Sequence, residues 1–277
     1  MADQKIAVVT GATSGIGQYI ALGLARAGYC TVLVARDPAR AETTRRWIAE
    51  RAPGAVTEPM LADLSSLEVT RSIGRAIAAR HPRIDVLVNN AGLITPKRQV
   101  TAEGHEMILA VNHLSPFVLT EALEPALQAA APARVVNVGS TASDRARIDL
   151  DDLEGERKWG AVSAYGRSKL AIMMATFDRA RRLHGDEVAV NVVHPGVVAT
   201  KIGSVSGPIG VAWRLGAPFM LTPEQGADTP LYVALSPHVQ GVTGRYFKKR
   251  KEAWPNPQAR DPALVGRLWS ETARLAG

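Results

Sequence analysis

The chain has 277 residues, 46% of them hydrophobic and 5% aromatic, and it carries a formal net charge of +7. This balance predicts a soluble globular protein with a large core and excludes a fibrous or disordered chain. The single cysteine, Cys30, excludes an internal disulfide, and the six histidines have no spacing typical of a metal site, so we predict no resident metal.

The N-terminal residues 1–5 lead directly into an apolar run. They contain no signal-peptide core, and no charge-free stretch is long enough to span a bilayer. We therefore expect a cytoplasmic protein without an integral membrane segment. The one dense basic run is Lys248-Lys249-Arg250-Lys251. Because no nucleic-acid motif accompanies it, we favour solvated charge over contact with nucleic acid or anionic lipid.

Apolar runs alternate with helical stretches along the chain. Strands are predicted at residues 6–10, 31–35, 56–61, 86–88, 134–138 and 188–193, and helices at 16–27, 38–51, 66–80, 101–128 and through Tyr165 to 183. Continuous apolar strands separated by long helices indicate a parallel sheet covered on both faces. We predict an α/β, doubly wound Rossmann-type sheet in one domain, residues 1–277, with strand order 3-2-1-4-5-6-7.

A glycine-rich turn, Gly11-Ala12-Thr13-Ser14-Gly15-Ile16-Gly17, follows the first predicted strand and opens the first helix. Glycine allows the backbone to turn tightly and to approach a pyrophosphate, which can rest on the amides of a helix N-terminus. The glycine spacing differs from the general dinucleotide fingerprint. A purely structural turn is the alternative, but the position between strand and helix favours cofactor binding.

The second strand ends at Ala35-Arg36-Asp37. An acidic residue here would bind ribose hydroxyls, whereas arginine pairs with a 2′-phosphate, so Arg36 favours NADP(H) over NAD(H). The alternative is that Arg36 is a surface charge and Asp37 caps the next helix. After the third strand, Asp63-Leu64 offers either a carboxylate for an adenine amine beside an apolar wall or a helix N-cap.

Tyr165 and Lys169 stand four residues apart, so a helix places both side chains on one face. A neighbouring ammonium favours the phenolate and would lower the pKa of Tyr165 from about 10. Tyr165 could then exchange a proton with a substrate oxygen. The alternative is an aromatic ring at the core edge beside a solvated amine.

The ordered set of motifs resembles the short-chain dehydrogenase/reductase superfamily over residues 5–247. The motifs are Thr10-Gly11-x-x-x-Gly15-Ile16-Gly17, Asp63, Asn89-Asn90-Ala91-Gly92, Asn112, Ser140, Tyr165-x-x-x-Lys169 and Pro195-Gly196. Three local features resemble its retinol-dehydrogenase-like branch. They are Ala35-Arg36-Asp37, the insert at residues 148–157, and Leu268-Trp269-Ser270.

The resemblance implies a role for each matching residue. Tyr165 would be the general acid-base, Lys169 would hold the nicotinamide ribose, Ser140 would hydrogen-bond the reacting oxygen, and Asn112 would keep a water near the lysine. Ser140 is preferred to the nearby hydroxyls of Thr141 and Ser143 because it directly ends the strand. Implied cofactor contacts are Gly11, Ser14, Gly15, Ile16, Gly17, Arg36, Asp63, Leu64, Asn90, Ala91, Gly92, Tyr165, Lys169, Pro195, Gly196, Val198 and Thr200.

We therefore predict an NADP(H)-dependent oxidoreductase that interconverts an aldehyde or ketone and an alcohol. Residues 201–222 are apolar with interspersed glycine and proline, which indicates either a flap over a lipophilic substrate or a core or subunit contact. Residues 248–277 form a C-terminal extension. The resemblance also implies a homodimer or homotetramer through the helices of Asn112 and Tyr165.

Two alternatives stay open. One is a catalytically silent NADP-binding regulator, which the complete set of Asn112, Ser140, Tyr165 and Lys169 disfavours. The other is a nucleotide-sugar epimerase or dehydratase on a related fold, which the lack of a large C-terminal domain disfavours.

Overall fold

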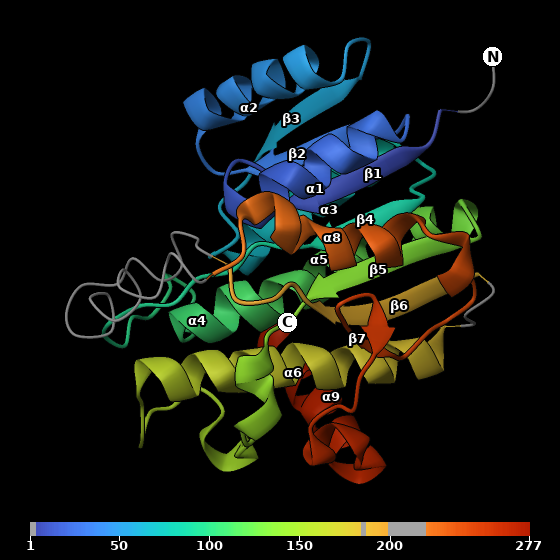
Figure 1. The fold of residues 1–277 in the computed structure, drawn as a ribbon. Coiled ribbons are helices and arrows are strands. Elements are labelled where there is room, and N and C mark those ends of the chain that lie inside the picture. The colour runs from blue at the N-terminus through green and yellow to red at the C-terminus, as the bar shows by residue number, and fades with distance from the viewer. Residues whose placement is uncertain (1–3, 184–186, 199–219) are drawn as a thin grey trace.

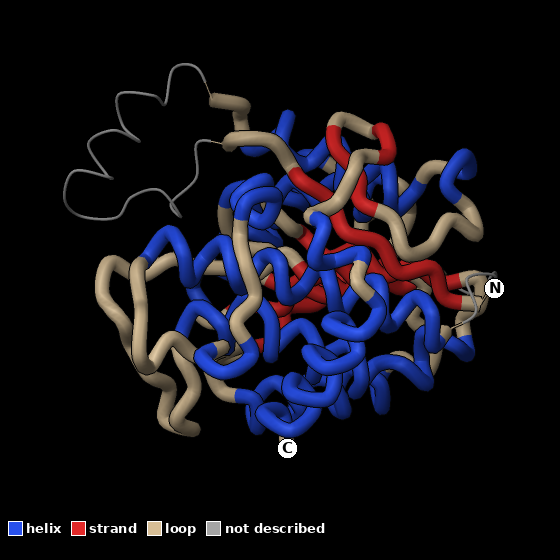
Figure 2. Tube along the Cα trace, turned by 90° about the horizontal axis from the view of Figure 1, so that it is seen from below, coloured by secondary structure: helices blue, strands red, loops and turns tan. Residues whose placement is uncertain are grey.

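The computed structural model describes residues 4–183, 187–198 and 220–277, which form one eight-stranded sheet between layers of helices (Figure 1; Figure 2). The strands are β1 (Ile6–Thr10), β2 (Cys30–Ala35), β3 (Thr57–Leu61), β4 (Val86–Asn89), β5 (Ala133–Val138), β6 (Val188–His194), β7 (Tyr246–Lys248) and β8 (Lys251–Glu252). Their order is β3-β2-β1-β4-β5-β6-β7-β8, and only β7 and β8 pair antiparallel. The predicted doubly wound sheet and its strand order are confirmed, with β8 added at the edge.

The central strands are apolar throughout because both faces of the sheet are covered. Every residue of β2 is buried. In β1, Ala7 and Val9 belong to one hydrophobic core, whereas Val8 belongs to the core on the opposite face. This two-sided burial explains the continuous apolar runs, since a strand with one wet face would alternate apolar and polar residues.

Helices α1 (Gly15–Arg26), α2 (Pro38–Arg51) and α8 (Pro223–Leu235) cover one face of the sheet. Helices α3 (Leu67–Arg80), α5 (Ser115–Ala129) and α6 (Ala161–Arg182) cover the other. The last helix, α9 (Pro262–Ala276), packs on the outer side of α6 (Figure 1). Within the part of the chain that the structure describes, no helix is both long enough and apolar enough to cross a membrane.

The helix predicted over residues 101–128 is wrong at its start and in its middle. Residues 101–106 form a turn, in which Gly104 has a left-handed φ of 92°. The helix begins as α4 (Met107–Leu109), widens into the π-helical segment η1 (Ala110–Leu114), and continues as α5. Pro116 accounts for the widening, because proline has no amide hydrogen and its ring would clash with the carbonyl of Asn112 four residues earlier.

The basic run 248–251 forms the hairpin turn between β7 and β8. Lys249 and Arg250 have φ angles of 49° and 60°, as the favoured two-residue hairpin turn requires. Lys248 is paired with Asp144 at 2.7 Å, and Arg250 is paired with Asp228. Much of this charge is therefore engaged by carboxylates of the same chain.

The C-terminal extension covers α6. Residues 166–176 of α6 are all buried, on the side that faces the sheet and on the side that faces away from it. The outer cover comes from α9 and the short helix η7 (Pro257–Arg260), and Trp269 of α9 packs edge-on against Phe117 at 4.8 Å between ring centres. The predicted homo-oligomer stays a prediction, but it would have to use other surfaces than the centre of α6.

Candidate active site

The predicted cofactor residues gather at the edge where the parallel strands end. The amide of Gly11 donates to the Val34 carbonyl of β2 at 3.1 Å, and Gly11 and Gly15 have left-handed φ angles of 64° and 55°. A Cβ added at Gly17 would lie 2.3 Å from both the Asn90 side-chain nitrogen and the Gly11 carbonyl oxygen. Only glycine therefore lets α1 pack this closely on the turn.

The first turn of α1 has no side-chain cap among the described residues. Ser14 occupies the N-cap position, but its side chain makes no capping hydrogen bond, and the first turn contains no acidic residue. Unpaired amides at a helix N-terminus attract an anion through both hydrogen bonding and the helix dipole. The segment from Ser14 through Ile16 to Gly17 can therefore hold a phosphate group.

Arg36 directly follows β2 and is exposed, and its guanidinium makes no ion pair with the residues described. Asp37 caps α2, since its Oδ1 accepts hydrogen bonds from the amides of Ala39 and Arg40 at 2.9 and 3.1 Å. The capping alternative for Asp37 is thus confirmed. Arg36 is left as a cation available to a phosphate.

Asp63 lies exposed after β3, and its Oδ1 accepts a hydrogen bond from the Ser65 amide at 3.0 Å. It is not the N-cap of α3, because Ser66 holds that position and accepts from the Val69 amide at 3.2 Å. Leu64 is buried in the hydrophobic core. A carboxylate thus stands beside a buried aliphatic side chain, as predicted for the adenine end of the cofactor.

The end of β4 is tied to the glycine turn by Thr10 and Asn90. Asn90 Nδ2 donates to the Thr10 carbonyl at 2.9 Å, and the Thr10 hydroxyl accepts from the amides of Asn90 and Ala91, both at 3.0 Å. The role of Thr10 in holding the two loops together was not predicted. The available signal was a threonine that ends an apolar strand directly before the glycine turn.

Asn112 lies in the π-helical segment and is buried. Its Oδ1 accepts from the Leu93 amide at 2.8 Å, and its Nδ2 donates to the Leu93 carbonyl at 3.0 Å and to Ser168 Oγ at 3.1 Å. A Cβ added at Gly92 would lie 3.2 Å from Asn112 Oδ1 and 3.3 Å from Lys169 Nζ. The structure thus brings Gly92, Asn112 and Lys169 together.

Three hydroxyls follow β5, and the structure separates their roles. Ser143 is fully buried and donates its hydroxyl to the Ser140 carbonyl at 2.6 Å. Thr141 opens the short helix η2 (Thr141–Arg145), for which Ser140 is the N-cap. The Ser140 hydroxyl accepts from the Ala142 amide at 3.2 Å, which leaves its own hydrogen to donate. Its side chain lies near the Tyr165 phenol and acts to lower the pKa of that group.

Tyr165 and Lys169 extend from the first half of α6, with Lys169 Nζ 5.9 Å from the centre of the Tyr165 ring. Lys169 is buried and donates to the Val138 carbonyl at 2.8 Å. Burial lowers the pKa of Lys169 to about 8, because desolvation penalises the ammonium.

Burial also raises the pKa of Tyr165 above its ordinary value, against the opposing effect of the nearby Ser140 side chain. The predicted lowering of this pKa by Lys169 is therefore wrong in this structure. Desolvation is the largest effect on the phenol, and the Lys169 ammonium is directed at the Val138 carbonyl.

The loop after β6 and the first turn of α1 both lie against Gly226 of α8. Gly196 has a left-handed φ of 92°, and a Cβ added there would lie 2.4 Å from Leu221 Cδ1. Val198 is buried, and a Cβ added at Gly226 of α8 would lie 2.6 Å from Val198 and 3.1 Å from Ile16. Pro195 is partly buried in the same loop.

One predicted cofactor residue, Thr200, lies outside the described residues, as do residues 201–219 of the predicted flap. Its last residues are described. Leu221 forms a bridge with Val198, and Thr222 begins α8 with a capping box that includes Gln225. The flap itself stays a prediction.

A buried polar chain below the strand rim was also not predicted. Asn89 Nδ2 donates to Asn137 Oδ1 at 2.9 Å and to Thr120 Oγ1 at 3.1 Å, and Asn137 Nδ2 donates to Thr176 Oγ1 at 2.9 Å. The chain joins β4 and β5 to α5 and α6. Asparagines inside otherwise apolar strands were the signal, because a buried amide requires partners.

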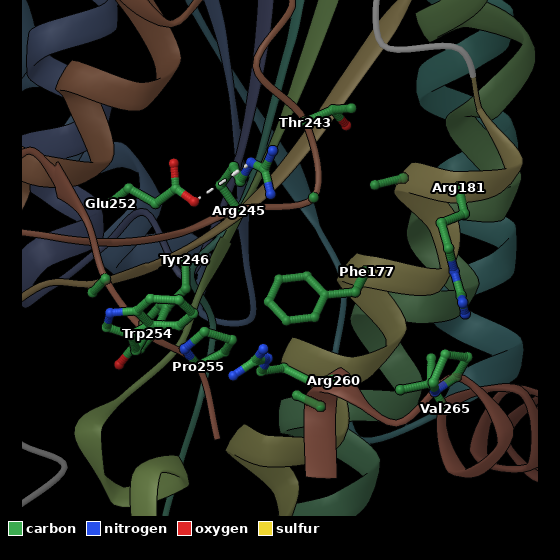
Figure 3. Close-up of a pocket in the computed structure, with 15 residues that line it drawn as sticks. Phe177, Arg181, Thr243, Arg245, Tyr246, Glu252, Trp254, Pro255, Arg260 and Val265 are labelled. Carbon is green, nitrogen blue, oxygen red and sulfur yellow. Dashed lines mark ion pairs between the residues drawn. The ribbon is translucent and has the colours of Figure 1, made fainter. Parts of the chain in front are cut away.

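A cavity of about 730 Å³ lies beside the second half of α6 (Figure 3). Phe177, Trp254 and Arg260 are among its lining residues, and Arg260 stacks over the Trp254 ring at 5.1 Å. None of the predicted site residues lines this cavity. It is therefore separate from the site at the strand ends.

A doubly wound sheet with a glycine-rich turn after its first strand, followed by a helix without a side-chain cap, is typical of a Rossmann-type dinucleotide-binding protein. Residues 5–207 match the family model described as short chain dehydrogenase. The chain belongs to the short-chain dehydrogenase/reductase family, in its retinol-dehydrogenase-like branch.

The branch is shown by curated relatives that match nearly the whole chain. Human retinol dehydrogenase 13 is 39% identical over 280 residues, covering 99% of this chain and 85% of the relative. Human retinol dehydrogenase 14 is 38% identical, covering 99% of this chain and 86% of the relative.

Solved structures support a nicotinamide dinucleotide cofactor. The chain is similar to RhlG of Pseudomonas aeruginosa in its complex with NADP, with a TM-score of 0.70 and 30% identity over 88% of this chain and 93% of that one. It is also similar to a metagenomic short-chain oxidoreductase in complex with NADP, with a TM-score of 0.62 and 29% identity over 83% and 90% of the two chains.

Proposed function

We propose that this oxidoreductase uses NADP(H) to interconvert a lipophilic aldehyde or ketone and the corresponding alcohol. The observation that carries the proposal is the convergence of Ser140, Tyr165 and Lys169 at the strand rim that also holds the glycine turn. The retinol dehydrogenases among its relatives support alcohol and carbonyl chemistry.

The residues present fit a nicotinamide dinucleotide with a 2′-phosphate. The amides of residues 14–17 would hold the pyrophosphate, Arg36 the 2′-phosphate, Asp63 the adenine amine, and Lys169 the nicotinamide ribose. The Asp37 carboxylate accepts hydrogen bonds from the amides of Ala39 and Arg40, so it is less available to accept them from ribose hydroxyls. This arrangement favours NADP(H) over NAD(H).

Residues of the chain transfer the proton and stabilise the charge that develops on the substrate oxygen. When bound, the nicotinamide supplies or accepts the hydride. During reduction, the hydroxyls of Ser140 and Tyr165 donate to the substrate oxygen as negative charge develops there, and Tyr165 transfers its proton. The raised pKa keeps Tyr165 protonated at neutral pH, which suits carbonyl reduction. In the reverse direction Tyr165 must first lose its proton, and the phenolate then removes the alcohol proton.

Exposed aliphatic side chains on α6 and beside the loop after β6 support a lipophilic substrate. Val162, Val197 and Leu221 expose 61%, 52% and 38% of their surface. Val162 precedes Tyr165 on α6, and the other two flank the loop after β6. Covering these side chains with an apolar substrate would remove them from water, which is favourable.

The test combines a binding measurement with a turnover screen. Fluorescence titrations with NADPH and NADH should give the lower Kd for NADPH. Absorbance assays with apolar aldehydes, ketones and alcohols should then detect NADPH consumption or formation. Tight NADPH binding without turnover of any member of this panel would contradict the proposed activity and favour the silent regulator.

A further inference from the structure

The C-terminal extension holds the loop that follows Ser140. Asn256 is buried, and its Nδ2 donates to the carbonyl oxygens of Ser143, Asp144 and Ala146 at 2.8, 3.2 and 2.9 Å. Its Oδ1 accepts from the Gln258 amide at 2.9 Å. One side-chain amide thus gathers three carbonyls that lie at least 110 residues earlier in the chain.

Residues of the extension, and Tyr246 just before it, hold the same loop. Lys248 Nζ contacts Asp144 Oδ2 at 2.7 Å, and the Tyr246 hydroxyl donates to Asp144 Oδ1 at 3.4 Å. The Gln258 side chain accepts from the Ile148 amide at 2.8 Å. Asn256 is the member of this group that bonds directly to the backbone of η2, next to Ser140.

The same loop is hydrogen-bonded to Ser140 and packs against the helix of Tyr165. The amide and the hydroxyl of Ser143 donate to the Ser140 carbonyl at 3.0 and 2.6 Å. On the opposite side, α6 packs closely on η2, since a Cβ added at Gly166 would lie 2.9 Å from the Ala142 carbonyl oxygen. Helix η2 is therefore held between the residue that follows Tyr165 and the side chain of Asn256.

We propose that Asn256 is a positioning residue that sets the Ser140 hydroxyl against Tyr165 by binding three carbonyls of the η2 loop. The proposal rests on the proposed function, which gives Ser140 its role at the substrate oxygen. Buried carbonyls that lose their donor are costly, so the loop shifts to find new partners. A displacement of about 1 Å in a reacting group can reduce turnover by about a hundredfold.

The direct test is Asn256→Asp, which keeps the shape and the acceptor for Gln258 but replaces the donor with a charge that repels carbonyls. We expect kcat to fall about ten- to a hundredfold, with the Kd for NADPH within about twofold of wild type. The matched control is Asp261→Ala, which removes the N-cap of α9 in the same extension and touches no residue of η2. An equal fall in kcat for Asp261→Ala would overturn the proposal, because loosening of the extension would then suffice.

A double-mutant cycle with Ser140→Ala separates this proposal from the proposed function. If Asn256 acts through Ser140, Asn256→Asp should cause no further loss of kcat once Ser140 is alanine. Independent, multiplicative losses would overturn the positioning role and leave the proposed function intact. Unchanged kcat in Ser140→Ala alone would overturn both. Should Asn256→Asp not fold, Asn256→Ser replaces it in the same cycle with the same criterion, because serine retains a single donor.

Discussion

The two sides of the strand rim differ in how their polar groups are engaged. On the β1–β2 side, α1 lacks a side-chain cap and Arg36 is exposed without an ion pair to the described residues. On the β5–α6 side, Asn112 and Lys169 are buried and hydrogen-bonded within the chain. Open donors suit an anion that arrives and leaves, whereas buried and bonded groups suit fixed placement of reacting atoms.

The N-termini of α1 and α3 at this same edge give a sharper contrast. Helix α3 is capped by Ser66 and also by Glu103, whose carboxylate accepts from the amides of Leu67 and Glu68 at 2.7 and 3.1 Å. An anion would meet occupied donors and a negative charge at α3, but open donors at α1. The capping of the two helices therefore favours α1 for the proposed phosphate site. Substitutions on the two sides of the rim should change different quantities.

The largest effect is expected from Tyr165→Phe on the buried side. Loss of the proton donor should lower kcat by about two to four orders of magnitude and leave the Kd for NADPH nearly unchanged. Tyr232→Phe on α8 is the matched control, since it removes a hydroxyl outside the site. Steady-state kinetics with purified proteins provide the measurement, and wild-type turnover in Tyr165→Phe would refute the acid-base assignment.

The burial of Lys169 predicts an unusual dependence of stability on pH. Its folded pKa of about 8 lies below the ordinary 10.5, so between these values the unfolded chain binds more protons and stability rises with pH. Below pH 8 the full cost of the buried ammonium is present, about 3 kcal/mol from the size of the shift.

Lys169→Met removes this titration. As pH rises from 8 to 10, the free energy of unfolding of wild type should therefore increase relative to that of Lys169→Met. Urea unfolding of both proteins at several pH values measures this difference. The contributions of other titrating groups are common to both proteins and cancel. Parallel curves across that range would show that burial does not depress the lysine pKa.

On the open side, Arg36→Ala should weaken cofactor binding without changing chemistry. Loss of a charged hydrogen-bonding partner predicts a rise in the Kd for NADPH of about ten- to a hundredfold. The Kd for NADH and the kcat at saturating NADPH should stay near wild type. Arg40→Ala, another exposed arginine four residues along on α2, is the control. Equal weakening of NADPH and NADH binding would remove Arg36 from the phosphate site.

The smallest effects are expected at two helical glycines, Gly17 and Gly266. Gly17 is in tight contact with its neighbours, whereas Gly266 has open space around it. Gly17→Ala forces a methyl group against the Gly11 carbonyl and should destabilise the fold by about 1–3 kcal/mol. Gly266→Ala on α9 has no atom within 4 Å of the new Cβ and should stabilise the fold by about 1 kcal/mol. Thermal unfolding checks both, and a destabilised Gly266→Ala would contradict the local packing described for α9.

Much of the fold could be predicted because its signals are local. The start of α2 follows from two residues. Asp37 is a capping residue, and Pro38 is a proline suited to the first helical position. The helix of Asn112 was predicted to begin too early, because residues 101–106 are mostly polar and Gly104 has a left-handed φ. Its middle was predicted incorrectly because Pro116 removes an amide donor and the helix widens before it. Strand β8 has two residues and no period, so it leaves no comparable signal.

By itself the sequence determined where the polar residues of the site would lie, because parallel strands all end at one edge and the motifs follow the strand ends. It could not determine the pKa of Tyr165 or Lys169, since desolvation depends on what the rest of the chain packs around them. Only the tertiary structure decided that Asn256 reaches the Ser140 loop, and that α9 covers α6. Those contacts join segments far apart along the chain, and a local sequence pattern does not predict which distant segments meet.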